Sequence, residues 1–245
     1  MSLVNFRDPA VLTDPDGLRI RPGALYRSAQ PFPAADEAVV AQLHTAGIRT
    51  IVDLRGTAEC ETADWAAAEA SGVTVVAARF EPTGDALDAA MRTMTTAADL
   101  GAFYLLMAET TPGALAAAVE AAARPGGVLL HCAAGKDRTG LLTALLLDLL
   151  DVPAERIVAD YARTTEALPQ IFAGLAERHR AALNDSREFH VPAPLLEAPA
   201  EAMAVFLDLV RARHGGSAAF LTACGVAPAT LDAFRAKAAA EVVAC

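Results

Sequence analysis

Lysine is nearly absent from this chain. Of its 20 lysine and arginine residues, only Lys136 and Lys237 are lysines, and they face 30 aspartates and glutamates. The formal net charge at pH 7 is therefore −10. Affinity for the phosphate backbone of nucleic acids depends on a surplus of basic side chains. The charge balance thus argues against a general nucleic-acid binder, and it makes the position of each lysine informative.

Long apolar runs are missing as well. No stretch approaches the roughly 18 uninterrupted apolar residues that a membrane-spanning helix needs. The most apolar segment, residues 140–150, is interrupted by Asp148 and is typical of a buried helix. The N-terminal residues contain no apolar stretch of signal-peptide length. We therefore expect a cytoplasmic protein with no stable membrane insertion, while export without a cleaved signal stays open.

Cysteine is sparse and scattered. Cys60, Cys132, Cys224 and Cys245 lie far apart and form no C-x-x-C pair, so they indicate neither a disulfide framework nor a zinc site. We expect no metal and no cofactor. Cys60 and Cys224 are typical of small apolar side chains on alanine-rich helices, and Cys245 of a free terminal residue. Cys132 differs because of the residues around it.

The pattern of apolar residues predicts an α/β fold. The chain is 54% hydrophobic and 20% charged, which excludes intrinsic disorder. Apolar β-branched runs predict strands at 24–27, 50–54, 73–77 and 128–131. Helical patterns lie at 34–46, 58–70, 111–123, 139–150, 154–168, 170–183, 200–214 and 229–242. We expect a central, mostly parallel sheet of about four to five strands flanked by helices, with a helical C-terminal half.

One domain over residues 1–245 is the preferred organisation. The irregular stretch 184–199 contains three prolines, Pro192, Pro194 and Pro199, and could mark a boundary, but each flank is small for a domain. Irregular connections often cover binding sites. The segments 84–99 and 168–199 are therefore candidate lids.

Residues 128–150, VLLHCAAGKDRTGLLTALLLDLL, predict a strand, a short loop and a buried helix. A loop that enters a helix N-terminus turns backbone N–H groups toward a bound anion, and the helix dipole adds to their field. The same field suits a thiolate nucleophile at Cys132. Arg138 carries a planar fork that can bind two phosphate oxygens, and Gly135 permits a tight turn.

Two alternatives compete for this loop. One is an ordinary strand–helix turn that contains Cys132 and Arg138 by chance, which is improbable given the useful residues between them. The other is a sulfurtransferase of the rhodanese type, whose cysteine loop is usually one residue shorter. Both are weaker than a phosphate-binding loop with a nucleophilic cysteine.

The segment 131–140, H-C-A-A-G-K-D-R-T-G, resembles the signature loop of the cysteine-dependent protein tyrosine phosphatases. Its GKDR version is similar to the bacterial branch of tyrosine phosphatase B and lipid phosphatases. Further matches in the right order are N-F-R-D at 5–8, R-P-G at 21–23, L-Y-R-S at 25–28, G-I-R-T at 47–50, V-D-L-R at 52–55, D-Y at 160–161 and G-G at 215–216. One departure is visible, because Pro9 and Ala10 replace the Leu-Gly-Gly that commonly follows N-F-R-D.

The resemblance implies roles for the loop residues. Cys132 would form a cysteinyl-phosphate intermediate. Arg138 would hold the phosphate oxygens together with backbone N–H groups. Thr139 would donate its hydroxyl to the Cys132 sulfur, or else cap the helix. The remaining phosphate-binding positions implied are Ala133, Ala134, Gly135 and Lys136.

The leaving oxygen needs a proton, so an aspartic acid must lie nearby. In the GKDR branch the loop aspartate is taken to serve, which is Asp137 here. Its alternative role is a helix N-terminal acid stabilised by the dipole. Asp53 at a predicted strand end and Asp85 in the flexible 81–85 segment compete for the same task.

Lys136 discriminates between substrates. A cation inside the loop would suit substrates with more than one phosphate. The chain uses arginine at almost every other basic position, so a lysine here is informative. A solvated surface lysine is the alternative.

Other positions have accessory roles or none. We expect His131 to be buried and to orient the loop backbone. We expect Tyr161, which follows Asp160, to pack in the core. Three arginines either bind substrate or form structural ion pairs: Arg7, Arg27 and Arg55.

The sequence as a whole predicts a metal-independent phosphomonoesterase. Its partners would be a phosphorylated protein, through phosphotyrosine and also phosphoserine or phosphothreonine, or a phosphoinositide. Two alternatives stay open: a phosphatase mainly of inositol lipids or inositol phosphates, and a catalytically silent phosphate-binding module. The alanine and arginine bias favours a bacterial source.

Overall fold

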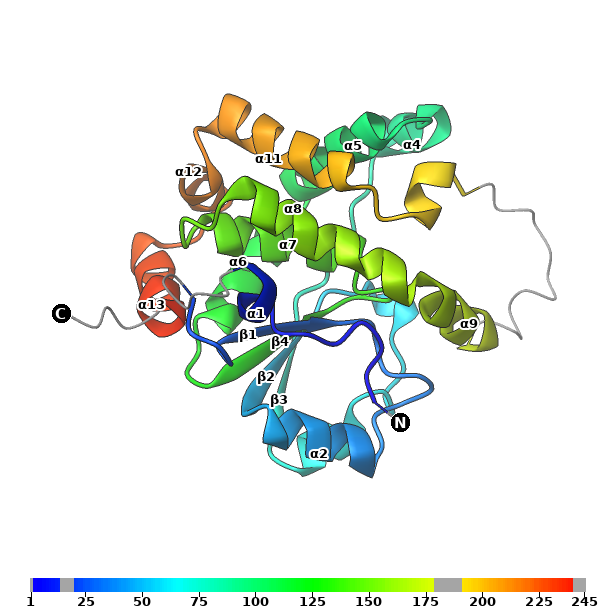
Figure 1. The fold of residues 1–245 in the computed structure, drawn as a ribbon, viewed down its shortest axis with the longest axis vertical. Coiled ribbons are helices and arrows are strands. Elements are labelled where there is room, and N and C mark those ends of the chain that lie inside the picture. The colour runs from blue at the N-terminus through cyan, green and yellow to red at the C-terminus, as the bar shows by residue number, and fades with distance from the viewer. Residues whose placement is uncertain (1, 14–19, 179–190, 240–245) are drawn as a thin grey trace.

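A four-stranded parallel sheet forms the centre of the computed structural model, which describes residues 2–13, 20–178 and 191–239 (Figure 1). The strands are β1 (Leu25–Ser28), β2 (Ile48–Asp53), β3 (Thr74–Ala77) and β4 (Gly127–His131). Their order is β1-β4-β2-β3, and every pairing is parallel. The last strand in the chain therefore lies inside the sheet, where all of its residues are buried. The predicted α/β class is confirmed.

One face of the sheet is covered by two short helices. These are α2 (Glu37–Thr45), which lies beneath the strands in Figure 1, and α3 (Ala66–Ala70). Leu43 of α2 packs with Ile51 and Leu129 of the sheet in one apolar cluster. A helix N-cap holds the start of α2 in place. Asp36 accepts a hydrogen bond from the Val39 N–H over 2.9 Å.

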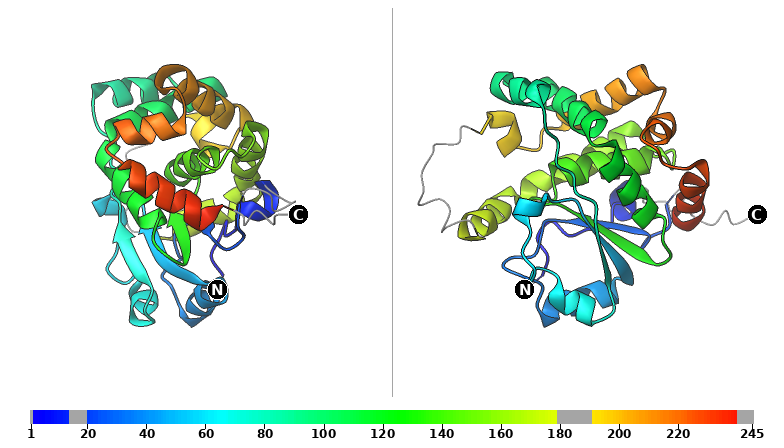
Figure 2. Two further views of the ribbon diagram at one scale, coloured as in Figure 1. Left: turned by 90° about the vertical axis from the view of Figure 1, so that its left-hand side faces the viewer. Right: turned by 180° about the vertical axis from the view of Figure 1, so that it is seen from behind.

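The opposite face carries two further layers (Figure 2). Helices α6 (Pro112–Ala122) and α7 (Asp137–Asp148) pack in one cluster with β4, and α5 (Ala97–Thr110), α8 (Ala154–Ala162) and α11 (Ala200–His214) cover them. Every residue of α7 from Thr139 to Leu147 is buried, as expected for a helix with neighbours on all sides. Helices α5 and α11 meet at Gly101, where a Cβ atom would lie 2.5 Å from the Ala202 carbonyl oxygen.

The remaining helices are short and peripheral. They are α1 (Ala10–Thr13), α4 (Asp85–Thr93), α9 (Leu168–Arg178), α12 (Ser217–Ala223) and α13 (Pro228–Ala238), with 3-10 turns η1 (Thr57–Glu59), η2 (Arg163–Ala167) and η3 (Ala193–Leu196). Helices α1, α4, α5 and α12 were not expected from the sequence. No strand follows β4 in the part of the chain that the structure describes, as predicted. The predicted ends of the helices at 170–183 and 229–242, and Cys245, lie outside the described residues.

The predicted helix at 58–70 is wrong in its first half. The turn η1 ends at Glu59, and the helix proper, α3, begins only at Ala66. Between them the Arg55 guanidinium binds the Asp64 carboxylate over 2.8 Å, and Asp64 in turn accepts from the Glu61 N–H. These bonds hold the segment in a bend that a continuous helix would not allow. In the same way, the predicted helix at 154–168 ends at Ala162 and continues as η2.

The candidate lid at 84–99 is largely helical. It holds α4 and the start of α5, and the described part of 168–199 holds α9 and η3.

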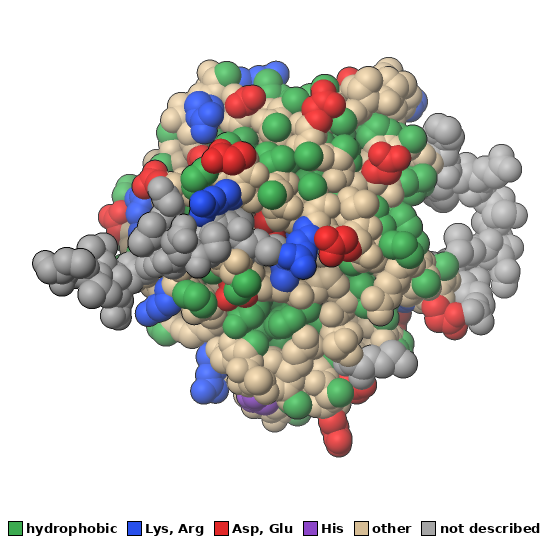
Figure 3. Space-filling model, in the orientation of Figure 1, with side chains coloured by type: hydrophobic (Ala, Val, Ile, Leu, Met, Phe, Trp, Pro, Cys, Tyr) green, Lys and Arg blue, Asp and Glu red, His purple; other side chains and the backbone are tan. Residues whose placement is uncertain are grey.

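On the face drawn in Figure 3, basic and acidic side chains are scattered among apolar ones rather than gathered into one patch. Within the described ranges no helix alone has the length and apolar character to cross a membrane, and α5 with α6, bent by 86°, passes that test only as a pair.

Candidate active site

The 132–138 loop joins β4 to α7 at the carboxyl edge of the sheet. Ligands of open α/β folds bind at this edge, outside the ends of the strands. Cys132 directly follows β4 and is only 2% exposed, and Asp137 is the first residue of α7. The sequence therefore places the loop where a central buried strand meets the N-terminus of a central buried helix.

The first two carbonyl groups of the loop bind groups outside it. The Cys132 oxygen lies 3.1 Å from His131 Nδ1, and the Ala133 oxygen accepts from the Gln30 N–H over 3.1 Å. Gln30 comes two residues after the end of β1, the edge neighbour of β4. Both oxygens are thus held on the side of the loop that faces β1 and His131.

The next two carbonyl groups bind the N-terminal part of the chain. The Gly135 oxygen accepts from Arg27 Nη2 over 2.8 Å and from Asn5 Nδ2 over 3.2 Å. The Asn5 amide also lies 3.5 Å from the Ala134 oxygen. The asparagine of the N-F-R-D motif therefore stabilises the outer side of the loop through hydrogen bonds to its backbone.

These contacts fix the direction of the backbone N–H groups. In a planar trans peptide the C=O and the following N–H point in opposite directions. Because hydrogen bonds hold the oxygens of 132–135 on one side, the N–H groups of 133–136 point to the other side of the loop. None of these four groups donates to another described residue. Together with the N-terminus of α7 they provide a set of unpaired donors of the kind that suits an anion.

Gly135 is required by this geometry. Its φ is +66°, and a Cβ atom there would lie 2.2 Å from the Ser28 carbonyl oxygen. Any side chain would therefore push the loop away from the end of β1. The sequence-based expectation of a tight turn at Gly135 agrees with this conformation.

A buried ion-pair cluster supports the outer side of the loop. Asp160 of α8 accepts from Arg27 Nη1 over 2.6 Å and from Arg7 Nε over 2.7 Å. Burial alone would raise the pKa of Asp160, but the charges of Arg27 and Arg7 lower it below its usual range. Arg7 also donates to the Thr164 hydroxyl over 3.2 Å. The sequence left open whether Arg7 and Arg27 bind substrate or form structural ion pairs. In the structure both form ion pairs with Asp160.

A second buried cluster contains Asp53 and Arg55. Both Asp53 oxygens accept from the Arg55 guanidinium, over 2.9 and 2.6 Å. Burial opposes ionisation, yet the hydrogen bonds and charge of Arg55 lower the pKa of Asp53 below the usual carboxyl range. Arg55 also binds Asp64, which Arg178 of α9 contacts through two bonds of 2.8 Å. Asp53 is thus held as a carboxylate, which suits a general acid poorly.

His131 is neutral, and its tautomer follows from its partners. The Trp65 indole can only donate, and its Nε1 lies 3.0 Å from His131 Nε2, so Nε2 accepts. The Cys132 carbonyl can only accept, so Nδ1 carries the proton. Burial lowers the pKa of His131, which favours the same neutral form. The expected role of orienting the loop backbone fits these bonds.

A cavity of about 380 Å³ opens on the α7 side of the loop. Asp137 and Arg138 reach it from the loop, and Asp85 does not line it. Its apolar wall consists of Phe80, Leu87, Met91, Phe103, Met107 and Leu195. Its other acidic residues are Glu59, Glu81 and Asp88. The candidate lid at 84–99 thus contributes to the wall through α4.

Arg138 is oriented by a carboxylate that the sequence did not reveal. Its two terminal nitrogens donate to the two oxygens of Glu59, with Nη2 2.7 Å from Oε1. Burial would raise the pKa of Glu59, but the hydrogen bond and charge of Arg138 lower it. A guanidinium has five N–H donors. Glu59 uses one on each terminal nitrogen, and the edge formed by Nε and the neighbouring Nη retains two for a phosphate.

Lys136 and Asp137 lie side by side at the entrance of α7. The Lys136 ammonium is buried and donates to the backbone oxygens of Leu195 and Glu197, the latter over 2.7 Å. It also lies 3.3 Å from Asp137 Oδ1. The lysine is thus not a solvated surface residue. Its assignment to a second phosphate stays a prediction, since the ammonium would have to leave these carbonyls.

The hydroxyl of Thr139 is the unused polar group of the loop. It is fully buried, and its Oγ1 has no hydrogen-bond partner within the described residues. A buried hydroxyl without a partner is costly, so it marks a place where a further acceptor is expected. The predicted acceptor, the sulfur of Cys132, lies seven residues earlier in the chain and does not accept a hydrogen bond from this hydroxyl in the structure.

Three contributing residues escaped the sequence-based prediction. Glu59 was placed inside a predicted helix, and Trp65 lacked any motif. Tyr104 of α5 donates to Asp137 Oδ1 over 2.6 Å and pairs with the Tyr161 hydroxyl over 2.7 Å. Tyr161 is buried in the core, as expected. A tyrosine in an apolar helix gave no sign that its hydroxyl reaches the loop.

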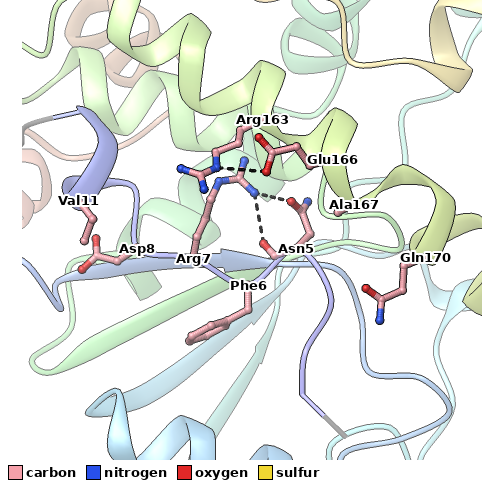
Figure 4. Close-up of a pocket in the computed structure, with 9 residues that line it drawn as sticks. All are labelled: Asn5, Phe6, Arg7, Asp8, Val11, Arg163, Glu166, Ala167 and Gln170. Carbon is pink, nitrogen blue, oxygen red and sulfur yellow. Dashed lines mark hydrogen bonds and ion pairs between the residues drawn. The ribbon is translucent and has the colours of Figure 1, made fainter.

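A second cavity of about 430 Å³ lies beyond Asn5, next to η2 and α9 (Figure 4). Figure 4 shows Arg7 turned toward Asn5 and Arg163 turned toward Glu166. The Nε, Nη1 and Nη2 atoms of Arg7 all donate to other protein groups. This cavity is therefore lined by charges of both signs, and its Arg7 is already bound to protein groups. Unlike the cavity beside Arg138, it receives no residue of the 132–138 loop.

Comparison with known proteins gives a consistent answer. The tyrosine phosphatase family matches residues 1–240. A protein of Cupriavidus necator named as a tyrosine-protein phosphatase is 33% identical over 171 residues, which is 67% of this chain and 62% of that protein. The triple specificity protein phosphatase PtpB of Mycobacterium tuberculosis is 31% identical over 123 residues, 47% of this chain and 44% of PtpB. The matched stretches thus cover less than two thirds of either relative.

Among solved structures, the catalytic core of Siw14 aligns with a TM-score of 0.44 and 16% identity, over 76% of this chain and 94% of that chain. The TpbA protein of P. aeruginosa aligns with a TM-score of 0.36 and 20% identity, over 86% of this chain and 93% of that chain. The family match extends over nearly the whole sequence and includes the cysteine–arginine loop. The chain therefore belongs to the tyrosine phosphatase family.

Proposed function

We propose that this protein hydrolyses phosphomonoesters, with phosphotyrosine as the preferred group, through a cysteinyl-phosphate intermediate on Cys132. The observation that carries the proposal is the 132–138 loop, whose carbonyl oxygens are tied outward and whose N–H groups face the other way. Membership of the tyrosine phosphatase family supports it. Backbone donors arranged in this way at a helix N-terminus would bind a dianion without a metal ion.

In the first step the Cys132 thiolate attacks phosphorus while the bond from phosphorus to the leaving oxygen breaks. Asp137 gives its proton to that oxygen, so a neutral alcohol or phenol leaves. The N–H groups of 133–136 and the free edge of Arg138 hold the other phosphate oxygens, where charge is greatest in the transition state. Asp137 borders the cavity that Arg138 enters, which supports this assignment over Asp53 and Asp85.

In the second step water attacks phosphorus and the phosphorus–sulfur bond breaks. Asp137, now a carboxylate, takes the proton from the water, and the thiolate is restored. Thr139 would donate its hydroxyl to the leaving sulfur. The burial of its Oγ1 without any partner among the described residues supports this role, because the hydroxyl is free to donate.

The cavity favours a substrate with one phosphate on an aromatic ring. Its apolar wall can pack against a ring. Glu59, Glu81 and Asp88 would repel further phosphates, and Arg138 is the one basic side chain among the lining residues. The similarity to PtpB, a triple specificity phosphatase, supports a wider substrate range that includes phosphoserine or phosphothreonine.

Lys136 favours a second candidate, a phosphatase mainly of phosphoinositides or inositol phosphates. Its ammonium lies 3.3 Å from Asp137 Oδ1 and would bind a second phosphate if it left the carbonyls of Leu195 and Glu197. Binding a second phosphate would therefore cost the buried Lys136 ammonium two hydrogen bonds. The monophosphate substrate requires no such loss.

Turnover of p-nitrophenyl phosphate in the presence of EDTA tests the reaction class. We expect Cys132→Ser to abolish turnover and Cys224→Ser, at the end of α12, to retain it. A Cys132→Ser variant that keeps its rate would overturn the mechanism, and wild-type protein without any turnover would leave a phosphate-binding module. A comparison of kcat/KM for a phosphotyrosine peptide and for a phosphoinositide in mixed micelles decides the substrate, with the peptide expected to be faster.

A further inference from the structure

Three oxygen atoms from three helices form a line that ends at Asp137. The Tyr161 hydroxyl of α8 lies 2.7 Å from the Tyr104 hydroxyl of α5, which lies 2.6 Å from Asp137 Oδ1 at the start of α7. Both tyrosines are at most 1% exposed. Their rings pack edge to face, and Phe206 of α11 packs against Tyr104 in the same way. The position of the Tyr104 hydroxyl is thus set by the core.

The direction of the hydrogen bonds in this line follows from counting protons. Each hydroxyl has one proton, and an ionised carboxylate only accepts. Tyr104 must then donate to Asp137, and Tyr161 must donate to Tyr104. In the reverse direction the Tyr161 proton would have no acceptor among the described residues, and a buried donor without an acceptor is costly. The line therefore runs from Tyr161 through Tyr104 to Asp137.

This direction also holds when Asp137 is protonated. Because Oδ1 already accepts from Tyr104, the proton of the acid must lie on Oδ2. Lys136 Nζ, 3.3 Å from Oδ1, adds positive charge at the same oxygen and again disfavours a proton there. Burial raises the pKa of Tyr104 well above its usual value, and the charge of Asp137 raises it further. Tyr104 therefore stays a donor over the whole working range of pH.

We infer that Tyr104 is a positioning residue for the general acid, which fixes Oδ1 of Asp137 so that Oδ2 presents its proton to the leaving oxygen. The inference rests on the proposed function, since it requires Asp137 to act as the acid. The hydrogen bond from Tyr104 also strengthens as Asp137 becomes negative during proton transfer. Its benefit is therefore greatest when the leaving group needs the proton most.

Tyr104→Phe tests the inference through leaving-group dependence. Phenyl phosphate has a poor leaving group and needs a proton, whereas p-nitrophenyl phosphate has a better one and needs it less. We expect the variant to lose about tenfold in kcat/KM on phenyl phosphate, as for one hydrogen bond to a charged group, and about twofold on p-nitrophenyl phosphate. An equal loss on both substrates would overturn the inference, because a merely structural defect does not distinguish leaving groups.

Two further variants make the outcome specific. Tyr26→Phe removes a tyrosine hydroxyl on β1, where the ring stacks on Phe6, and should leave both rates unchanged. In an Asp137→Asn background the Tyr104→Phe change should cost no further activity, since both act through one proton. Additive losses would overturn the inference while leaving the proposed function intact. If Asp137→Asn alone lowers kcat/KM by the same factor on both substrates, the assignment of the acid in the proposed function fails instead.

Discussion

Arginine and aspartate side chains lie on both sides of the 132–138 loop, but they have different roles on the two sides. On the outer side Arg27 and Asp160 are about 1% exposed, and both oxygens of the aspartate are bound by arginines. On the cavity side the side chains of Arg138 and Asp137 are 16% and 24% exposed, and each retains a group that no described residue binds. Arg27 keeps one unpaired atom, its buried Nε, but that atom is closed off from the cavity by the core. Buried charges bound to one another thus form a scaffold, and charged groups left unbound at the cavity are available for chemistry.

The same division bears on phosphate binding by an acidic protein, which the proposed function requires. With a net charge of −10 the long-range field repels a dianion. The binding energy must then come from short-range donors, which the outer scaffold keeps in place. Changes on the outer side should therefore affect stability, and changes on the cavity side should affect rates.

Asp160→Asn should have the largest effect. It leaves Arg27 and Arg7 buried next to a neutral amide, and breaking a buried pair from one side costs about 3–5 kcal/mol. Urea unfolding at pH 7 measures the loss. Asp208→Asn, which removes an exposed carboxylate 3.8 Å from Arg211, is the control and should change stability by less than about 0.5 kcal/mol. Equal losses in the two variants would contradict the division between the two sides.

The stability difference between wild type and Asp160→Asn should depend on pH in one direction. The folded-state pKa of Asp160 is lowered, so its carboxylate stabilises the fold above its unfolded pKa of about 3.9. That contribution is lost as the pH falls through the folded-state pKa. Thermal unfolding should show a constant gap between pH 5 and 7 that narrows below about pH 4. A gap that widens in acid would reverse the assigned sign.

The core of the site could be predicted from the sequence because it is local. Cys132 and Arg138 lie in one loop between a strand and a helix, and both flanking elements have strong apolar patterns. The partners of the loop could not be predicted in this way. Asn5 and Arg27 reach it from the N-terminal part of the chain, and Asp160 of α8 holds Arg27, so only the tertiary fold brings these residues together.

Alanine explains part of what was missed. An alanine-rich segment favours a helix by propensity alone, so residues 58–70 have a helical pattern throughout. The contacts of Arg55 with Asp64 and Glu59 override this weak preference and place Glu59 on Arg138. The strands were predicted more closely because β-branched residues bounded by glycine and charge give a stronger signal than alanine does.

Glu59→Ala should have the second largest effect, on the cavity side. Without the carboxylate the Arg138 guanidinium is free to rotate, and its binding edge is no longer fixed toward the phosphate. We expect kcat/KM for p-nitrophenyl phosphate to fall about tenfold with little change in the unfolding midpoint. Glu59→Gln, which retains an acceptor oxygen, should lose less. A rise in kcat/KM would show that Glu59 competes with phosphate for the arginine.

Lys136→Met should have a moderate effect. It removes the hydrogen bonds to Leu195 and Glu197, so the 193–197 segment loses its attachment to the loop. Because Leu195 lines the cavity, we expect KM for a phosphotyrosine peptide to rise about threefold with a smaller change in kcat. The same variant tests the second phosphate. A loss on phosphoinositides that greatly exceeds the loss on the peptide would assign Lys136 to substrate rather than to the 193–197 segment.

Asp88→Asn should have the smallest effect and the strongest dependence on salt. Asp88 lies on α4 at the cavity and is exposed, so its charge acts on substrate through water and within a screening length of about 10 Å at 0.1 M salt. We expect kcat/KM for a doubly phosphorylated peptide to rise about twofold at low salt and not at 0.5 M salt, with little change for a singly phosphorylated peptide. Asp232→Asn, an equally exposed carboxylate on α13, is the matched control and should change neither rate. If both variants respond alike, the whole net charge disfavours the second phosphate, whereas a response at Asp88 alone means that the acidic cavity selects the substrate.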